Sequence, residues 1–251
     1  MTLTDAPWWL WPIGGAILGA IFGSFIATLV IRWPQDRAVG SGRSACDACG
    51  KPLGATELIP LLSALIQRGK CRHCGVAINP RHWLIELIAA LVGAFALGIA
   101  PGLAGLAGAV FGWMLIALIA LDAEHYWLPD RLTLPLLLLG FGGGLIGLDP
   151  PFIDRLWGAA GGYISLAVIA LAYKLIRKRD GLGGGDPKLL GAIGAWLGWQ
   201  PLPMVLLGAS GIGLLFVLIQ HLRGQPMQPT DRLPLGSLMG IAGFVIWVVG
   251  Q

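Results

Sequence analysis

The sequence predicts an all-α polytopic membrane protein with about eight transmembrane helices and one small cysteine-rich loop on the cytoplasmic side. Of the 251 residues, 56% are hydrophobic and only 12% are charged, a balance far from that of soluble domains. The mean hydropathy is +0.76, and apolar stretches close to the length of a bilayer crossing recur along the chain. The expected solvent for most of this chain is therefore lipid.

Seven apolar stretches are long enough to be read as spans. An eighth, at 189–199, is shorter than a full crossing and rich in Gly and Ala. The first stretch is too long, and too lightly flanked by positive charge, to be a cleavable signal peptide, so we expect a retained helix. The seven stretches are 8–31, 83–100, 103–121, 132–148, 156–176, 202–220 and 233–249.

The positions of the basic residues support eight spans. With eight spans, every second loop lies on the same side of the membrane. Of the 17 Lys and Arg residues, only Arg155 falls outside the loops of one side, and cytoplasmic loops hold most such residues. This predicts both termini outside the cytoplasm. The net charge of +4 is explained by helix orientation and contact with anionic lipid, so no nucleic-acid partner is expected.

Three regions follow from this topology: a first transmembrane helix at 1–31, a cytoplasmic cysteine-rich loop at 32–82, and a membrane-embedded domain at 83–251. Only the loop is long enough to fold on its own. The chemistry is therefore expected in the loop or at helix ends.

All four cysteines lie in that loop, as Cys46-x-x-Cys49 and Cys71-x-x-Cys74 with 21 residues between the pairs. Two such knuckles can supply four thiolates to one tetrahedral zinc ion, which leaves no open position for catalysis. A structural zinc site is the leading interpretation. Two disulfides, which a reducing cytoplasm disfavours, and a redox pair are the alternatives, and His73 is an alternative ligand.

Two acidic residues at the edges of apolar stretches need an explanation, because carboxylates are costly there. Asp122 ends the third span, and Asp186 precedes the short one, both on the predicted cytoplasmic face. Two carboxylates at one depth can share a proton, and one then acts as base and the other as acid. Asp186 before Pro187 is also a good helix cap, and Asp122 is alternatively a solvated helix end.

Neighbouring residues complete the candidate pair. The glycines before Asp186, including Gly183 and Gly185, leave backbone free to lie against an extended peptide. Asp130 follows Pro129 at the start of the fourth span, where helix capping is the favoured role and a supporting carboxylate is the alternative.

These motifs together resemble the bacterial type IV prepilin peptidases, or prepilin leader peptidases, which belong to the GxGD membrane aspartyl proteases. The resemblance covers nearly the whole chain. It is carried by LDAEHYWLPDRLTLP at 121–135, GGGD at 183–186, KLL at 188–190, GSF at 23–25 leading to Arg32 and Pro34, the cysteine pairs, and INPR at 78–81 with Glu86.

The resemblance implies a membrane aspartic endopeptidase that cuts the basic leader from type IV prepilins or type II secretion pseudopilins, after a glycine and at the cytoplasmic face of the inner membrane. It implies that Asp122 and Asp186 are catalytic, with Gly183, Gly185 and Lys188 in the loop motif. It also implies zinc at the four cysteines and makes 83–251 the peptidase domain.

Many members of that family also methylate the new N-terminal amine with S-adenosylmethionine. This chain departs from the family pattern at Ala27, where Asn is usual, and at His82-Trp83, where Tyr-Pro is usual. Glu86 is the candidate residue for methyl transfer or for shaping the loop; a carboxylate favoured by the helix dipole is the alternative. Two other functional classes stay open, a proton-coupled transporter and a pilus-assembly scaffold.

Overall fold

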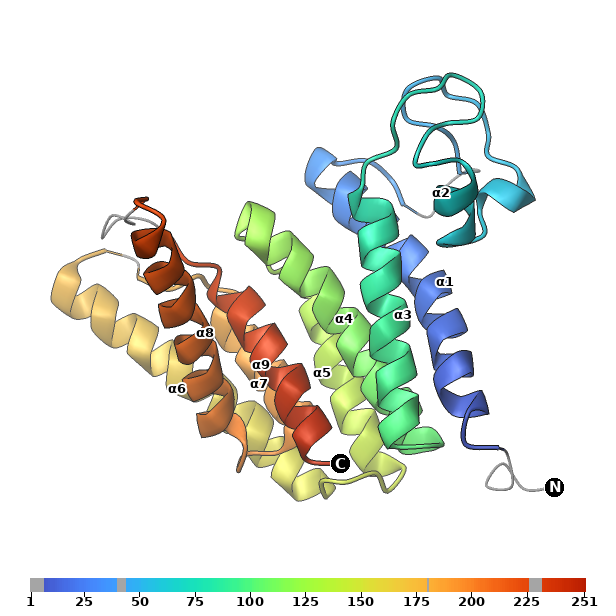
Figure 1. The fold of residues 1–251 in the computed structure, drawn as a ribbon. Helices are drawn as coiled ribbons and strands as arrows, with labels where there is room; N and C mark the ends of the chain where they lie inside the picture. Colours follow the sequence, from blue (N-terminus) through green and yellow to red (C-terminus); the bar gives the residue numbers. More distant parts are fainter. Residues whose placement is uncertain (1–6, 40–43, 180, 226–231) are drawn as a thin grey trace. The chain divides into compact units, whose positions relative to one another are not determined.

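The structure is a computed structural model that describes residues 7–39, 44–179, 181–225 and 232–251. It divides into two compact units, Met1–Ala117 and Leu118–Gln251. Helix α4 (Leu103–His125) crosses the division (Figure 1).

In the first unit, α1 (Leu10–Arg32) and α3 (Arg81–Ile99) run side by side (Figure 1). Glycine permits the contact, because a Cβ at Gly19 would lie 2.1 Å from the Ala89 carbonyl oxygen. Trp113 of α4 donates its indole N–H to the same carbonyl at 2.9 Å and stacks on Phe22. Small residues that allow close backbone approach are how membrane helices associate without a hydrophobic driving force between them.

The chain between α1 and α3 forms a loop with little regular structure of its own. Its short helical segments are η2 (Trp33–Gln35), η3 (Ala55–Glu57) and α2 (Leu62–Ile66). Two isolated β-bridges, between Ala45 and Pro52 and between Lys70 and Ala77, close the two cysteine turns.

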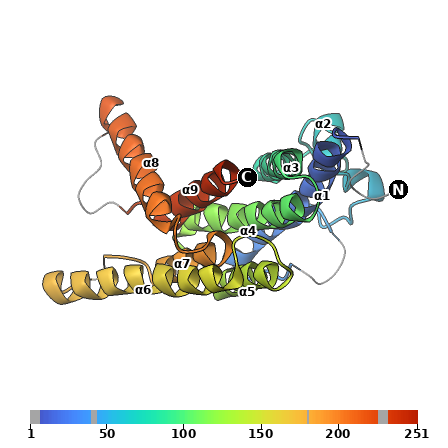
Figure 2. The same ribbon diagram turned by 90° about the horizontal axis from the view of Figure 1, so that it is seen from below.

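In the second unit, the short helix α7 forms the core. Ten of its residues are buried, and Figure 2 shows it beside α6 and α5. A Cβ at Gly158 of α6 would lie 2.3 Å from the Gly194 carbonyl of α7, so this packing also depends on glycine. The helices that follow α4 are α5 (Asp130–Leu145), α6 (Phe152–Arg177), α7 (Asp186–Leu197), α8 (Leu202–Leu222) and α9 (Leu235–Val249).

Arg155, the exception to the charge rule, has a structural role. The residue is 2% exposed, and all of its donor nitrogens reach backbone carbonyls, which offsets part of the cost of burying its polar groups. The acceptors lie in α5, in α7 and in the turn between α5 and α6. They are Gly140 and Ala195 (2.7 and 3.0 Å), Leu148 and Asp149 (3.1 and 2.7 Å), and Pro150 (2.8 Å).

The membrane fold class is confirmed. Each predicted apolar stretch contains a helix, and within the described residues five helices, α1, α3, α4, α6 and α8, are long and apolar enough to cross a membrane. The other three matching helices are shorter, with 16 residues in α5, 12 in α7 and 15 in α9. At about 1.5 Å per residue, α7 rises about 18 Å, less than the hydrocarbon thickness of about 30 Å. It is a short helix that is buried within the second unit.

Candidate active site

Asp122 lies in the last turn of α4 and is buried, with 4% of its surface exposed. One oxygen, Oδ2, accepts the backbone N–H of Ser237 at 2.7 Å, and the Ser237 hydroxyl lies 3.0 Å from the same oxygen. The alternative of a solvated helix end is therefore wrong. The start of α9 supplies the polar partner that a buried carboxylate requires.

Asp186 is the first residue of α7 and is also buried. The N-cap position belongs to Gly185, and the Asp186 Oδ2 atom accepts the N–H of Gly183 at 3.0 Å. The capping alternative is therefore wrong. The carboxylate folds back over the glycine segment that precedes it, which fixes its orientation.

The two carboxylates interact electrostatically within the second unit. Asp186 lies outside the five candidate spans. Burial, and then the charge of Asp122, raise the pKa of Asp186 from 3.8 to about 6, although the Gly183 N–H opposes the shift. Two like charges that are close together cannot both ionise readily, so the pair retains a proton at a pH where an isolated aspartate has lost it.

Leu128, in the turn after α4, packs against two glycines beside the pair. A Cβ at Gly185 would lie 2.7 Å from the Leu128 Cβ atom, and a Cβ at Gly236 would lie 2.8 Å from Leu128 Cδ1. The same added atom at Gly236 would lie 2.9 Å from Asp122 Oδ2. The absence of side chains at both glycines lets the α4–α5 turn, the glycine segment and α9 converge.

Asp130 forms an exposed ion pair with Lys188, whose Nζ atom lies 2.7 and 2.9 Å from the two carboxylate oxygens. The N-cap of α5 is Pro129, so the favoured capping role of Asp130 is wrong. The pair joins the first turns of α5 and α7. Exposed ion pairs contribute about 0 to 1 kcal/mol, so this contact adds little to the stability of the fold.

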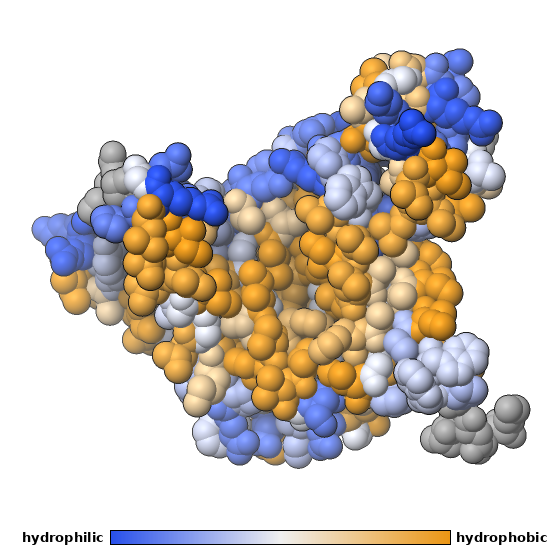
Figure 3. Space-filling model, viewed as in Figure 1, coloured by the Kyte–Doolittle hydropathy of each residue, from blue (hydrophilic) through white to orange (hydrophobic). Residues whose placement is uncertain are grey.

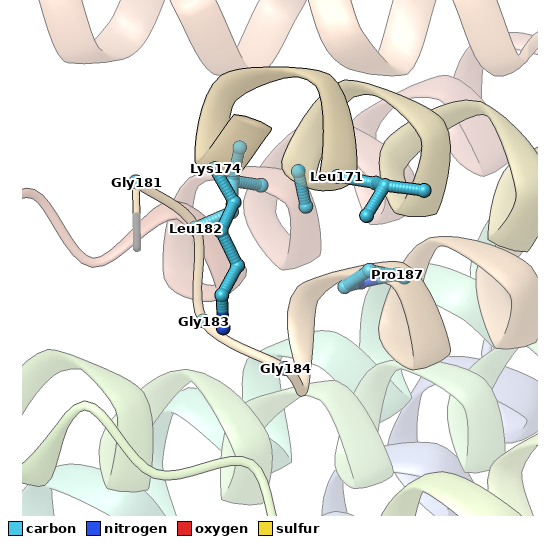
Figure 4. Close-up of a pocket in the computed structure, with 8 residues that line it drawn as sticks. Leu171, Lys174, Gly181, Leu182, Gly183, Gly184 and Pro187 are labelled. Atoms are coloured by element: carbon cyan, nitrogen blue, oxygen red, sulfur yellow. The ribbon is translucent and has the colours of Figure 1, made fainter. Parts of the chain in front are cut away.

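A pocket of roughly 480 Å³ opens beside the glycine segment, between it and α6. Figure 4 shows Leu171 of α6 facing Pro187, while the Lys174 side chain extends toward Gly183. The lining is mainly apolar side chain and glycine backbone, which suits an extended peptide with an apolar side chain. The lining residues are Ala170, Leu171, Lys174, Gly181, Leu182, Gly183, Gly184 and Pro187.

The four cysteines come together in the loop of the first unit, as free thiols whose sulfur atoms all lie within 4.8 Å of one another. The Sγ atoms of Cys46 and Cys74 are 3.9 Å apart. A tetrahedral Zn–S₄ centre with bonds of about 2.3 Å has sulfur–sulfur edges of about 3.8 Å. The donor set and its spacing therefore fit one metal ion.

Both knuckles are built from the same turn. The backbone N–H of Cys46 donates to the Lys51 carbonyl at 3.0 Å, and that of Cys71 donates to the Val76 carbonyl at 2.8 Å. The glycine after each pair takes a left-handed conformation, with φ of 68° at Gly50 and 72° at Gly75. Glycine adopts this conformation without steric cost.

The pKa values of two thiols reflect the crowding of the sulfur atoms. Backbone N–H groups of Cys74 and then His73 lower the pKa of Cys71 to about 7. The N–H of Val76 favours the Cys74 thiolate as well, but partial desolvation and the neighbouring sulfurs raise the pKa of Cys74 to about 11. A metal ion offsets this crowding of negative charge, because coordinating thiols are deprotonated outright.

Glu86 lies in the second turn of α3 and is 7% exposed. Its Oε2 atom accepts the N–H of Leu61 at 2.8 Å, just before α2. The carboxylate therefore holds the cysteine loop to α3. This geometry fits the loop-shaping side of the expectation for Glu86.

Sequence reasoning missed three residues around the pair: Ser237, Gly236 and Leu128. A signal was present for Ser237, because it follows a glycine at the start of an apolar stretch and the predicted topology puts it at the aspartate face. Leu128 lies within the motif at 121–135, but an apolar side chain there does not indicate a contact with glycines beside the pair. Gly236 carries no comparable signal, since glycine is ordinary in a membrane helix bundle.

Most of the chain matches known protein families. Residues 17–98 match the Bacterial Peptidase A24 N-terminal domain, and residues 109–218 match the Type IV leader peptidase family. A protein of Aeromonas salmonicida (strain A449) named prepilin leader peptidase/N-methyltransferase is 42% identical over 215 residues, covering 83% of this chain and 72% of the relative. The chain belongs to the type IV leader peptidase family.

Other relatives in this family carry the same name. A Burkholderia pseudomallei (strain K96243) protein is 38% identical over 254 residues, covering 90% of this chain and 82% of its own. A Pseudomonas aeruginosa protein is 36% identical over 260 residues, covering 94% and 89%. No solved structure matches significantly. The leader peptidase match contains Asp122 and Asp186, and the N-terminal match contains the cysteines and Glu86.

Proposed function

We propose that this protein is a membrane aspartic endopeptidase that removes the basic leader from type IV prepilins or type II secretion pseudopilins. The observation that carries the proposal is the pair of buried, interacting carboxylates at the end of α4 and the start of α7. Membership of the type IV leader peptidase family supports the substrate class.

The environments of the carboxylates suggest separate roles. The backbone N–H and the hydroxyl of Ser237 stabilise negative charge on Asp122, whereas the raised pKa of Asp186, about 6, increases the protonated fraction of that carboxyl, which is the form that acts as the acid. Asp122 takes a proton from a water molecule as the water oxygen bonds to the scissile carbonyl carbon, and Asp186 gives its proton to the carbonyl oxygen. When the carbon–nitrogen bond breaks, the leaving amine takes the proton that Asp122 holds, and the hydroxyl on the reacting carbon returns its proton to Asp186.

The glycine segment 181–185 and the adjoining pocket provide the binding surface. Backbone groups of Gly183 and Gly184 border the pocket, and a segment without side chains can lie along an extended peptide and exchange hydrogen bonds with it. The ion pair between Asp130 and Lys188 keeps this segment aligned with α5.

Zinc is the metal we propose for the cysteine cluster. Cys46, Cys49, Cys71 and Cys74 would hold it, and four thiolates leave no position for substrate, so the metal stabilises the loop. We also propose a second activity, because the relatives are named N-methyltransferases. S-adenosylmethionine would supply the methyl group for the new N-terminal amine. Glu86 contributes by holding the loop through Leu61.

The proposed organisation keeps 1–31 as the first transmembrane helix, 32–82 as the cytoplasmic loop and 83–251 as the peptidase domain. The chain is a multi-pass protein of the bacterial inner membrane, and we propose that both termini lie outside the cytoplasm with lipid around the helices. The site then faces the cytoplasm, where a leader that remains there would reach it.

The test is coexpression with a prepilin. Asp122→Asn and Asp186→Asn should each abolish leader removal while the protein still inserts in the membrane, because neither amide can carry a transferable proton. Normal processing by either variant would contradict the proposal. Proton flux in liposomes by a protein without peptidase activity would instead favour the transporter, and an inert protein that binds pilus components would favour the scaffold.

A further inference from the structure

The loop of the first unit exposes an apolar segment that the proposed function does not use. Five large aliphatic side chains lie within nine residues around α2, and an exposed cluster of this kind marks an interaction site. Their exposed fractions are 46% for Leu58, 44% for Ile59, 54% for Leu62, 76% for Leu65 and 79% for Ile66.

One hydrogen bond places this segment beside the start of α3. The N–H of Leu61 donates to Glu86 at 2.8 Å, and Glu86 lies five residues after Arg81, where α3 begins. At about 1.5 Å per residue, that is about 7 to 8 Å along the helix. Because a long side chain on a helix points toward the N-terminal end of that helix, the Leu61 N–H lies beside the first two turns of α3, which is a candidate membrane span.

The turn that precedes α2 has an unusual backbone conformation. Leu61 has φ 62° and ψ −47°, a conformation that residues with a side chain rarely adopt. The buried Glu86 carboxylate supports this turn by accepting the Leu61 N–H. A rare backbone conformation persists only where its surroundings hold it, so the direction in which α2 leaves the turn is built into the loop.

The surface around α2 combines apolar and cationic side chains, the two features that favour binding to a bilayer surface. In Figure 3, apolar surface gathers over the part of the loop that contains α2, and strongly hydrophilic surface lies next to it. Arg68, Lys70 and Arg72, all exposed, follow directly after α2. Apolar side chains next to cationic ones match the boundary between acyl chains and anionic headgroups.

We propose that residues 58–66 are an interfacial membrane anchor. The aliphatic side chains of this anchor lie among the acyl chains of the leaflet at which α1 ends and α3 begins. Arg68, Lys70 and Arg72 contact anionic phospholipid headgroups. The anchor holds the cysteine loop down on the bilayer, so the loop is a membrane-bound platform rather than a freely tumbling domain. This proposal does not depend on the peptidase assignment.

Photo-crosslinking in the full-length protein tests whether phospholipid contacts residues 58–66. A photoreactive phenylalanine analogue replaces Ile66, and a matched variant carries it at Lys51, an exposed polar position in the same loop. Both proteins are placed in nanodiscs of phosphatidylcholine with phosphatidylglycerol, illuminated, and measured by intact mass. The expected result is phospholipid adducts at position 66 and little adduct at 51, with lower yield in phosphatidylcholine alone. Adducts mainly to a second copy or to a coexpressed prepilin, or equal yields at the two positions, would overturn the anchor.

A second measurement uses trypsin, which cuts after Arg68, Lys70 and Arg72. The double change Leu65→Asp with Ile66→Asp should speed cleavage in nanodiscs at least about tenfold, since it removes two aliphatic groups from the apolar phase. Thr56→Asp, at an exposed polar site in the same loop, should leave the rate unchanged. Equal cleavage of wild type and the double variant contradicts the proposal.

Discussion

Replacing Asp186 by asparagine should make the protein more stable at neutral pH although it removes the proposed activity. The asparagine side chain has the same shape, and its carbonyl oxygen can still accept the Gly183 N–H. What changes is the charge, which burial and the Asp122 carboxylate disfavour. The variant therefore isolates the cost of holding an ionised group at this position.

The size and sign follow from the pKa of Asp186, which is 3.8 for an ordinary aspartate and about 6 in the folded protein. Below pH 3.8 the residue is protonated in both states and costs nothing. Between these values the folded state holds more protons, so stability falls as pH rises. Above pH 6 the cost is constant at about 3 kcal/mol, because each pKa unit corresponds to about 1.4 kcal/mol.

Thermal unfolding in nanodiscs, followed by tryptophan fluorescence from pH 4 to pH 8, measures this effect. A cost of about 3 kcal/mol corresponds to a rise in Tm of roughly 6 to 12 °C for a chain of this size. Asp186→Asn should melt higher than wild type at pH 8, and the difference should shrink toward zero at pH 4. Asp130→Asn is the control, because its carboxylate is 66% exposed. A Tm gain for Asp186→Asn that is independent of pH, or no gain at pH 8, would refute the reasoning.

Three further predictions concern the surroundings of the pair and the metal. Ser237→Ala should lower kcat/KM at least about tenfold, since a hydrogen bond to a charged group contributes about 1.5 to 3 kcal/mol; Ser165→Ala, which loses a hydroxyl bonded to the Gly162 carbonyl, should keep wild-type activity, and equal loss in both would contradict the role of Ser237. Gly236→Ala should abolish cleavage because its Cβ would lie 2.9 Å from Asp122 Oδ2, whereas Gly211→Ala faces open space among the described residues and should be active; an active Gly236→Ala enzyme would refute the contact. Metal analysis of reduced protein should find about one zinc ion per chain, and Cys71→Ser should lose it; wild-type protein without metal would exclude the site.

The positions of the helices could be predicted because lipid imposes a simple rule on sequence. A helix that crosses the bilayer needs a run of apolar residues, and each predicted run contains a helix. The rule says less about α7, which has only 12 residues and is buried within the second unit. The cysteine cluster could also be predicted from the sequence, since each pair of cysteines is local and the two pairs together define most of the metal site.

The polar contacts of the site could not be derived in the same way. Ser237 lies 115 positions after Asp122, and Lys188 lies 58 positions after Asp130. Such pairs depend on how helices pack, and no local period in the sequence records them. Helix capping was predicted for Asp130 because aspartate is common at the start of a helix. In the structure its carboxylate instead pairs with Lys188, which belongs to another helix.

The measurement closest to the central claim is mass spectrometry of a pilin N-terminus after incubation of the prepilin with purified protein. Wild-type protein should release the leader after its terminal glycine, and added S-adenosylmethionine should increase the mass of the new N-terminus by one methyl group. Asp122→Asn protein that is folded and inserted in the membrane should leave the prepilin intact. An unprocessed prepilin with wild-type protein, or undiminished cleavage by Asp122→Asn, would contradict the assignment of the carboxylate pair as the catalytic centre.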